Sequence, residues 1–256
     1  MIQQPFSTAR WSAKQLGVPL VMGVLVLSAL NRWHIDVLLA NWLFHLEGGA
    51  PWPLRHQRLF EQVLHNGGKQ LVTLMSLVLI VATIASQLRP QWRHYRRSLL
   101  MVLLSVASTI MLVRYGKSLT NVSCPWDLAM FGGDKPLVMF PNSLFSQQTL
   151  GQCYPGGHSS GAFAWVAMYY FARVNKPAWR KPLLILATAL GVTFAVTQEL
   201  RGAHFLSHDL TSLWLAWLVA TSWYGVCYRP WQSAAKTHPL SDVSPSLKLA
   251  PAEPQA

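Results

Sequence analysis

Three short clusters of polar residues in this chain have side chains that could do chemistry. The first runs from Lys117 to Trp126, the second from Tyr154 to Ser160 and the third from Arg201 to Asp209. Each lies beside an apolar run, where an ionisable side chain is costly unless it has a partner or a task. The clusters contain histidines, cations and carboxylates, which are the groups needed to bind a phosphate and move a proton.

The second cluster, Tyr-Pro-Gly-Gly-His-Ser-Ser, predicts a tight turn followed by the start of a helix. Free backbone N–H groups at a helix start favour an anion, so we expect Gly156, Gly157 and Ser159 to bind substrate. His158 at this point can give a proton to a leaving oxygen. The simpler explanation is a helix cap, in which Ser159 or Ser160 satisfies the first turn.

In the third cluster Arg201, His204 and His208 are spaced to share one face if the segment is helical. Arginine offers a forked cation for phosphate oxygens, and a neutral imidazole is a competent nucleophile when a neighbour fixes its tautomer. Asp209 or His208 could be that neighbour of His204. Lys117 of the first cluster supplies a second cation. The simpler explanations are a polar helix end and a lysine that snorkels to the interface.

The elements that must position these clusters are membrane spans. Of the 256 residues 52% are hydrophobic and 12% charged, too few charges to cover a globular surface. The first apolar run follows basic residues but is not followed by a small-x-small cleavage site, which favours an uncleaved first span. We predict an all-α bundle of six transmembrane helices at roughly 16–30, 71–88, 98–113, 161–172, 182–198 and 210–226.

Two long connections and a tail complete the predicted organisation. The segment 31–69 contains an amphipathic pattern that predicts an interfacial helix in the first outer loop, formed by Leu38, Leu39, Trp42, Leu43 and Leu46. The segment 114–155 is expected to be an irregular loop. Residues 1–228 are expected to form a single membrane-embedded catalytic domain, and 229–256 a disordered cytoplasmic tail rich in Ser, Pro and Ala.

The basic residues indicate how the chain is oriented. Six spans would place thirteen Lys and Arg with two acidic residues on the side of the termini, against eight and seven on the other side. By the positive-inside bias both termini are cytoplasmic and the three clusters lie outside. In a bacterium this means the inner membrane, with a periplasmic active site. The basic residues form short loop clusters that anchor topology, so nucleic acid is not expected as a partner, and no protein partner is indicated.

The cysteines are consistent with an oxidising compartment. The charge-derived orientation places Cys124 and Cys153 outside and Cys227 near the inner end of the last span. A disulfide between the two outer cysteines would close a loop of about 30 residues and contribute roughly 3 to 4 kcal/mol. The alternative is a pair of free buried thiols.

Together the clusters resemble the type 2 phosphatidic acid phosphatase family, a six-helix membrane bundle with the patterns K-x6-R-P, P-S-G-H and S-R-x5-H-x3-D. The resemblance covers Lys117 to Asp209. Cys124 stands where the family has Arg, and Gly156 stands where it has Ser. In the first two patterns the matching residues are Lys117, Pro125, Pro155, Gly157 and His158.

The third pattern departs further. His204 fits the family histidine, but His208 then takes the place of the acid, with Asp209 one position later. The family arginine falls on Gln198, while Arg201 lies three residues before His204. In an alternative register His208, seven residues after Arg201, is the catalytic histidine.

The resemblance implies a lipid phosphatase that works in two steps. His204 would attack phosphorus to form a phosphohistidine, and His158 would protonate the departing oxygen before water releases phosphate. Lys117 and Arg201 would neutralise the equatorial oxygens. Asp209 or a neighbouring imidazole would hold the nucleophile in its reactive tautomer. The family implies neither a metal nor a cofactor.

Three alternatives stay open. The enzyme could transfer the phosphate to a second lipid, for example lipid A, instead of to water. A chain that kept the fold but lost activity would be a lipid-binding or transport protein. A metal site could form from His158, His204 and His208, completed by Glu199 or Asp209. The sequence does not choose among phosphatidic acid, phosphatidylglycerol phosphate, undecaprenyl diphosphate and lipid A as substrate.

Overall fold

The computed structural model describes residues 8–49 and 51–230. These ranges are helical or irregular and contain no β-strand, apart from an isolated bridge between Leu128 and Lys135. The predicted disordered tail, 229–256, lies outside the described residues except for its first two positions. The prediction of an all-α fold is confirmed.

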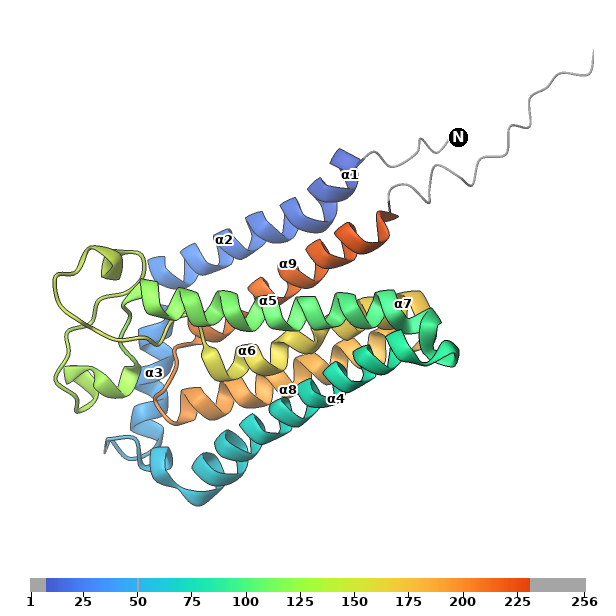
Figure 1. The fold of residues 1–256 in the computed structure, drawn as a ribbon. Coiled ribbons are helices and arrows are strands. Elements are labelled where there is room, and N and C mark those ends of the chain that lie inside the picture. Colours follow the sequence, from blue (N-terminus) through green and yellow to red (C-terminus); the bar gives the residue numbers. More distant parts are fainter. Residues whose placement is uncertain (1–7, 50, 231–256) are drawn as a thin grey trace, which may run out of the picture.

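The described chain forms a bundle of long helices (Figure 1). Helix α1 (Thr8–Ser12) continues through a π-helical turn into α2 (Val18–Arg32), and α3 (Ile35–Leu46) follows. The other helices are α4 (Gly68–Leu88), α5 (Arg96–Thr120), α6 (Gly157–Phe163), α7 (Met168–Asn175), α8 (Arg180–Leu200) and α9 (Leu206–Tyr228). A nine-residue π-helical segment, Leu59–Gly67, leads into α4. A short 3₁₀ helix, Pro90–Tyr95, leads into α5.

Five helical segments of the described chain are long and apolar enough to cross a membrane, so this is a multi-pass membrane protein. They are Thr8–Arg32, Leu59–Leu88, Pro90–Asp127, Pro177–Leu200 and Leu206–Tyr228. The remaining predicted span, 161–172, which is the fourth in chain order, falls on α6, a 3₁₀ turn and α7, which together form one broken helix. A total of six spans therefore stays a prediction.

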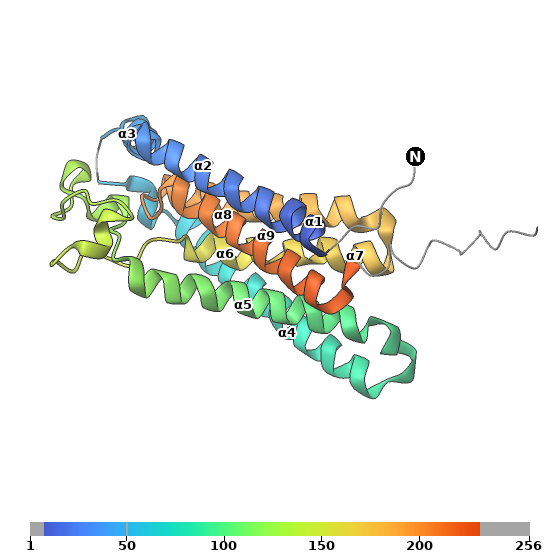
Figure 2. The same ribbon diagram turned by 90° about the horizontal axis from the view of Figure 1, so that it is seen from above.

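The broken helix of α6 and α7 runs through the middle of the bundle (Figures 1 and 2). Its alanines are fully buried, and small residues allow helix backbones to approach closely where lipid replaces water as solvent. Gly191 of α8 shows how close the approach is, because a Cβ there would collide with the ring of Phe163. Burial by protein, rather than by lipid, explains why this segment is less apolar than the others.

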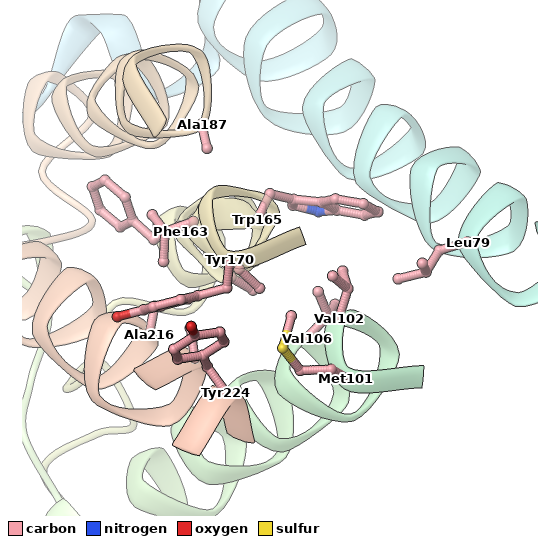
Figure 3. Close-up of a cluster of buried hydrophobic side chains, with 14 residues drawn as sticks. Leu79, Met101, Val102, Val106, Phe163, Trp165, Tyr170, Ala187, Ala216 and Tyr224 are labelled. Atoms are coloured by element: carbon pink, nitrogen blue, oxygen red, sulfur yellow. The ribbon is translucent and has the colours of Figure 1, made fainter. Parts of the chain in front are cut away.

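The core lies where α4, α5, α8 and α9 surround this central segment (Figure 3). Tyr170 stacks on Tyr224 with ring centroids 4.6 Å apart, and its hydroxyl shares a 2.6 Å hydrogen bond with Thr221. The pairing satisfies a polar group that lipid could not. Met101, Val102 and Val106 are apolar core residues contributed by α5.

The bundle has two unlike ends (Figure 1). The site end carries α3, the irregular segment 121–156 and the turn 201–205. The basic end carries α1, the short connections 89–95 and 176–179 and the last turn of α9. Helix α3 lies across the site end with Leu43 buried and Trp42 exposed, as expected of an interfacial helix.

Two expectations about local structure were wrong. The segment 201–208 is not one helix, because α8 ends at Leu200 and Gly202 adopts a left-handed conformation with φ of +67°. His204 therefore lies in a turn while His208 lies in α9. The irregular segment also starts later than predicted, since α5 extends to Thr120 and includes Lys117.

Candidate active site

His204 lies in the turn between α8 and α9 and lines a cavity of about 630 Å³. Its Nδ1 is 2.8 Å from Oδ1 of Asp209, and both side chains are buried. Since a carboxylate only accepts, His204 donates from Nδ1, and its Nε2 keeps a lone pair. The structure thus brings Asp209, and not His208, to the ring of His204.

Asp209 in the first turn of α9 receives further contacts. The hydroxyl of Ser159 donates to Oδ1, the same oxygen that faces His204, and Glu199 lies near enough to interact with the Asp209 carboxyl group electrostatically. Charge-assisted bonds of this kind fix a carboxyl group in one orientation. Ser159 therefore contacts Asp209 and is not part of the cavity wall, in contrast to the substrate-binding role expected for it.

Gly156 makes room for this arrangement. A Cβ on Gly156 would collide with Asp209 Oδ1 and would lie 2.7 Å from Ser159 Oγ and 3.1 Å from His204 Nδ1. Two departures from the family pattern thus explain each other. The acid that sits one position late occupies the space that a serine side chain at 156 would need.

His158 lies at the start of α6, which begins at Gly157 as predicted. Its ring stacks on Phe194 with centroids 4.4 Å apart and an interplanar angle of 18°. Its Nε2 is buried and forms no hydrogen bond with the described residues. His158 also lines the cavity and lies near enough to His204 to interact with it electrostatically. A buried, unpartnered ring nitrogen beside a nucleophile is suited to proton transfer.

Lys117 reaches the same cavity from the outer end of α5. Its Nζ donates to the carbonyl oxygen of Pro155 over 3.4 Å, and its charge interacts with Asp209. Gly157 contacts the Lys117 side chain closely, because a Cβ there would lie 3.4 to 3.6 Å from it. Between α4 and α5 the cavity is lined by apolar Val72, Ile110 and Val113 and by the cations Lys69 and Arg114.

Arg201 lies behind the cavity wall rather than on it. The side chain is 5% exposed and donates from Nε to the Arg55 carbonyl oxygen and from Nη1 to Gln198 Oε1, both over 3.2 Å. Burial lowers the pKa of Arg201 from its ordinary value, although a guanidinium stays charged. Its contact with the cavity runs through Gln198, which does line it.

His208 is fully buried and faces away from this cavity. Its ring centroid is 6.0 Å from that of His204, and it lines a second cavity of about 330 Å³ with Asp36 and Tyr154. The main-chain carbonyl of His208 accepts the N–H of Gly156 over 2.9 Å. The geometry therefore favours the register in which His204 is the nucleophile.

The turn 201–205 is held by two loops that are distant from it in the sequence. Trp52 packs so closely on Gly202 that a Cβ there would collide with its indole, and Trp126 N–H donates to the Gly202 carbonyl over 2.9 Å. Asp36 of α3 accepts the N–H of Ser207 over 2.8 Å at the start of α9. Burial raises the pKa of the Asp36 carboxyl group.

Cys124 and Cys153 form a disulfide with a Cα–Cα distance of 5.3 Å. Both cysteines line the cavity. The Thr120 hydroxyl donates to the Tyr154 carbonyl next to this bridge. The end of α5 is thereby tied to the segment that enters α6, which brings Lys117 beside Gly157.

Comparison with known proteins agrees with this geometry. The sequence model of the PAP2 superfamily matches residues 98–231, which include all three clusters. The chain belongs to the PAP2 superfamily. A solved PAP2 structure, the transmembrane PAP2-type phosphatidylglycerolphosphate phosphatase from Bacillus subtilis, matches with a TM-score of 0.55. The two are 17% identical, over 83% of this chain and 95% of the other, so the likeness concerns the fold. A comparison with curated protein sequences found no match.

Two residues of this PAP2 site were not predicted from the sequence patterns. They are His65 and Gln198, whose side chains form a hydrogen bond with each other. His65 precedes α4 and lines the cavity, with its ring centroid 4.5 Å from that of His158. No local signal marks it, because its position depends on how the helical segment Leu59–Leu88 packs against α8. Among the described residues, no three His, Cys, Asp or Glu side chains are grouped to hold a metal ion.

Proposed function

We propose that this PAP2 protein hydrolyses a lipid phosphate or diphosphate through a phosphohistidine on His204. The observation that carries the proposal is the His204–Asp209 pair, 2.8 Å apart, facing a cavity that Lys117 and His158 also line. Membership of the family supports a membrane lipid phosphatase. The apolar side chains between α4 and α5 are suited to an acyl or prenyl chain, and the cations that line the same cavity are suited to a phosphate.

In the first step Nε2 of His204 attacks phosphorus while the bond to the lipid oxygen breaks. The departing oxygen takes a proton from His158, so the lipid alcohol or lipid phosphate leaves without extra charge. Asp209 holds the proton on Nδ1 and stabilises the positive charge that develops on the ring. Lys117 stabilises the equatorial oxygens, with the charge of Arg201 behind Gln198 adding to the local field.

In the second step water attacks the phosphohistidine. His158, now lacking its proton, accepts one from the water as the P–N bond breaks, which restores His158 and frees inorganic phosphate. Phosphoryl transfer needs positioning and charge stabilisation above all, and the contacts to Asp209 supply the positioning.

The proposed location is the bacterial inner membrane, with both termini cytoplasmic and the site periplasmic. The positive-inside bias supports it, since the clusters and the basic connections lie at opposite ends of the bundle. A disulfide at the site end agrees with an oxidising compartment. We propose residues 1–228 as one catalytic domain.

The test is phosphate release by the detergent-purified protein from phosphatidic acid, phosphatidylglycerol phosphate, undecaprenyl diphosphate and lipid A, with and without EDTA. We expect release from at least one lipid, insensitive to EDTA and abolished by His204→Ala and by His158→Ala. His56→Ala is the matched control, because that side chain is 75% exposed. Label from a radioactive lipid phosphate should be covalently bound to the unchanged protein when the reaction is stopped during turnover, and to no protein carrying His204→Ala.

Three results would contradict the proposal. Phosphate release that survives His204→Ala would show that His204 is not the nucleophile. Transfer of label to an added acceptor lipid, without release to water, would identify a phosphotransferase instead. An absence of both reactions would favour a lipid-binding protein.

A further inference from the structure

His65 is a third histidine in the cavity wall, contributed by a segment outside the three clusters. It lies in the turn Leu59–Gly67 that leads into α4, and its ring packs beside His158 at 4.5 Å between centroids. It is close enough to Arg201 and His204 to interact with both electrostatically. The ring thus borders the space where a phosphate bound at His204 would lie.

The proton position on His65 follows from its partners. Nη1 of Arg201 donates to Gln198 Oε1 over 3.2 Å, and since a guanidinium cannot accept, the amide oxygen must face it. The amide nitrogen of Gln198 then faces Nδ1 of His65 at 2.8 Å. An amide N–H donates, so Nδ1 accepts, and the neutral imidazole carries its proton on Nε2.

Building on the function proposed above, we propose that His65 binds the substrate phosphoryl group through its Nε2–H, with Gln198 and Arg201 as positioning residues. The family pattern has a charged arginine at the position of Gln198. In this chain the guanidinium lies behind the wall, and an amide and an imidazole extend from it to the cavity. Each hydrogen bond in such a chain polarises the next, which strengthens the terminal donor.

Two substitutions separate a donor from a packing residue. His65→Phe keeps a ring against His158 but has no N–H, whereas His65→Gln keeps an amide N–H at a similar reach. We expect His65→Phe to lower kcat/KM for the lipid phosphate about 10- to 100-fold, the usual effect of losing one hydrogen bond to a charged group. His65→Gln should stay within about fivefold of the unchanged protein. The control is His56→Phe, on an exposed histidine of the same outer segment.

Gln198→Leu tests whether the amide acts through His65. We expect Gln198→Leu alone to lower kcat/KM clearly. Added to His65→Phe, the same substitution should cause almost no further loss. Additive losses would overturn the assignment of Gln198 as a positioning residue for His65.

Binding of orthovanadate can be measured without turnover. It therefore tests the role of His65 separately from the proposed phosphatase activity. The full-length protein in detergent should be stabilised against heat by orthovanadate, and this shift should be lost in His65→Phe and kept in His65→Gln. A chain without phosphatase activity that shows this pattern would contradict the proposed function and support the role of His65. Equal results for His65→Phe and His65→Gln, or an unchanged kcat/KM and vanadate shift in His65→Phe, would overturn the role of His65.

Discussion

At the site end of the bundle, segments far apart in the sequence meet around His204, whereas at the basic end short turns simply join neighbouring helices (Figure 1). The turn 201–205 is fixed by Trp52 and Trp126 from two different loops. The connection Pro90–Tyr95 instead carries exposed side chains such as Arg93. Contacts from distant loops thus impose an unusual backbone on the turn 201–205, whereas long-range contacts at the basic end, such as the Ser98–Tyr228 hydrogen bond, join side chains of regular helices. Substitutions at the site end should therefore affect kcat/KM or stability more strongly than substitutions at the basic end.

The largest effect is expected from Gly156→Ala. The added methyl group would collide with Asp209 Oδ1 and crowd His204 Nδ1, so the nucleophile would lose its orientation. We expect kcat/KM to fall by about 100-fold or more, since a displacement of about 1 Å in a catalytic group has effects of this size. The matched control is Gly157→Ala, where the new methyl group meets the flexible Lys117 side chain at 3.4 Å and should be far better tolerated. Similar rates in the two variants would contradict the role given to Gly156.

The second effect concerns the disulfide. Replacing Cys124 and Cys153 together by Ser should lower the free energy of unfolding by about 3 kcal/mol, because the 29-residue separation is no longer constrained in the unfolded chain. Thermal unfolding in detergent measures it, with Cys227→Ser as the control from the basic end. A double variant as stable as Cys227→Ser would show that the site end is held without the bridge.

A smaller, pH-dependent effect is expected from Asp36→Asn. Burial raises the folded-state pKa of Asp36 above its unfolded value, so the folded protein retains a proton that the unfolded chain has released. The contribution of this group to stability is therefore greatest at low pH and declines as the pH rises above about 4. Asparagine keeps an acceptor for the Ser207 N–H without the charge. At neutral pH we expect the variant to be more stable by about 1 kcal/mol, with the difference disappearing near pH 4.

The smallest effect is expected at the basic end. Arg93→Gln removes an exposed charge from a turn far from the cavity, and should change kcat/KM less than twofold and stability by less than about 0.5 kcal/mol. Activity and melting temperature, measured beside Gly156→Ala, make the comparison direct. A loss like that of Gly156→Ala would mean that the two ends are coupled through the helices.

The sequence predicted the features that depend on local composition. Long apolar runs, the interfacial helix and the start of α6 follow from residue type and spacing, and the structure contains them. It could not predict which residue orients His204, because the left-handed Gly202 breaks the helix on which Arg201, His204 and His208 would share a face. His65 was missed for a related reason. Its place beside His158 results from packing of the helical segment Leu59–Leu88 against α8, a contact between residues more than a hundred positions apart.

The space at Gly156 also constrains how this form of the site could have arisen. Ser at 156 and an acid at 209 cannot occupy the same volume, so the two positions form a coupled pair. A lineage that began with the usual serine and an acid one position earlier would have to lose the serine side chain first, since a glycine leaves only a small void. Gaining the acid first would place a carboxyl group where a hydroxyl already lies. The two departures from the family motifs, at 156 and 209, are thus sterically coupled.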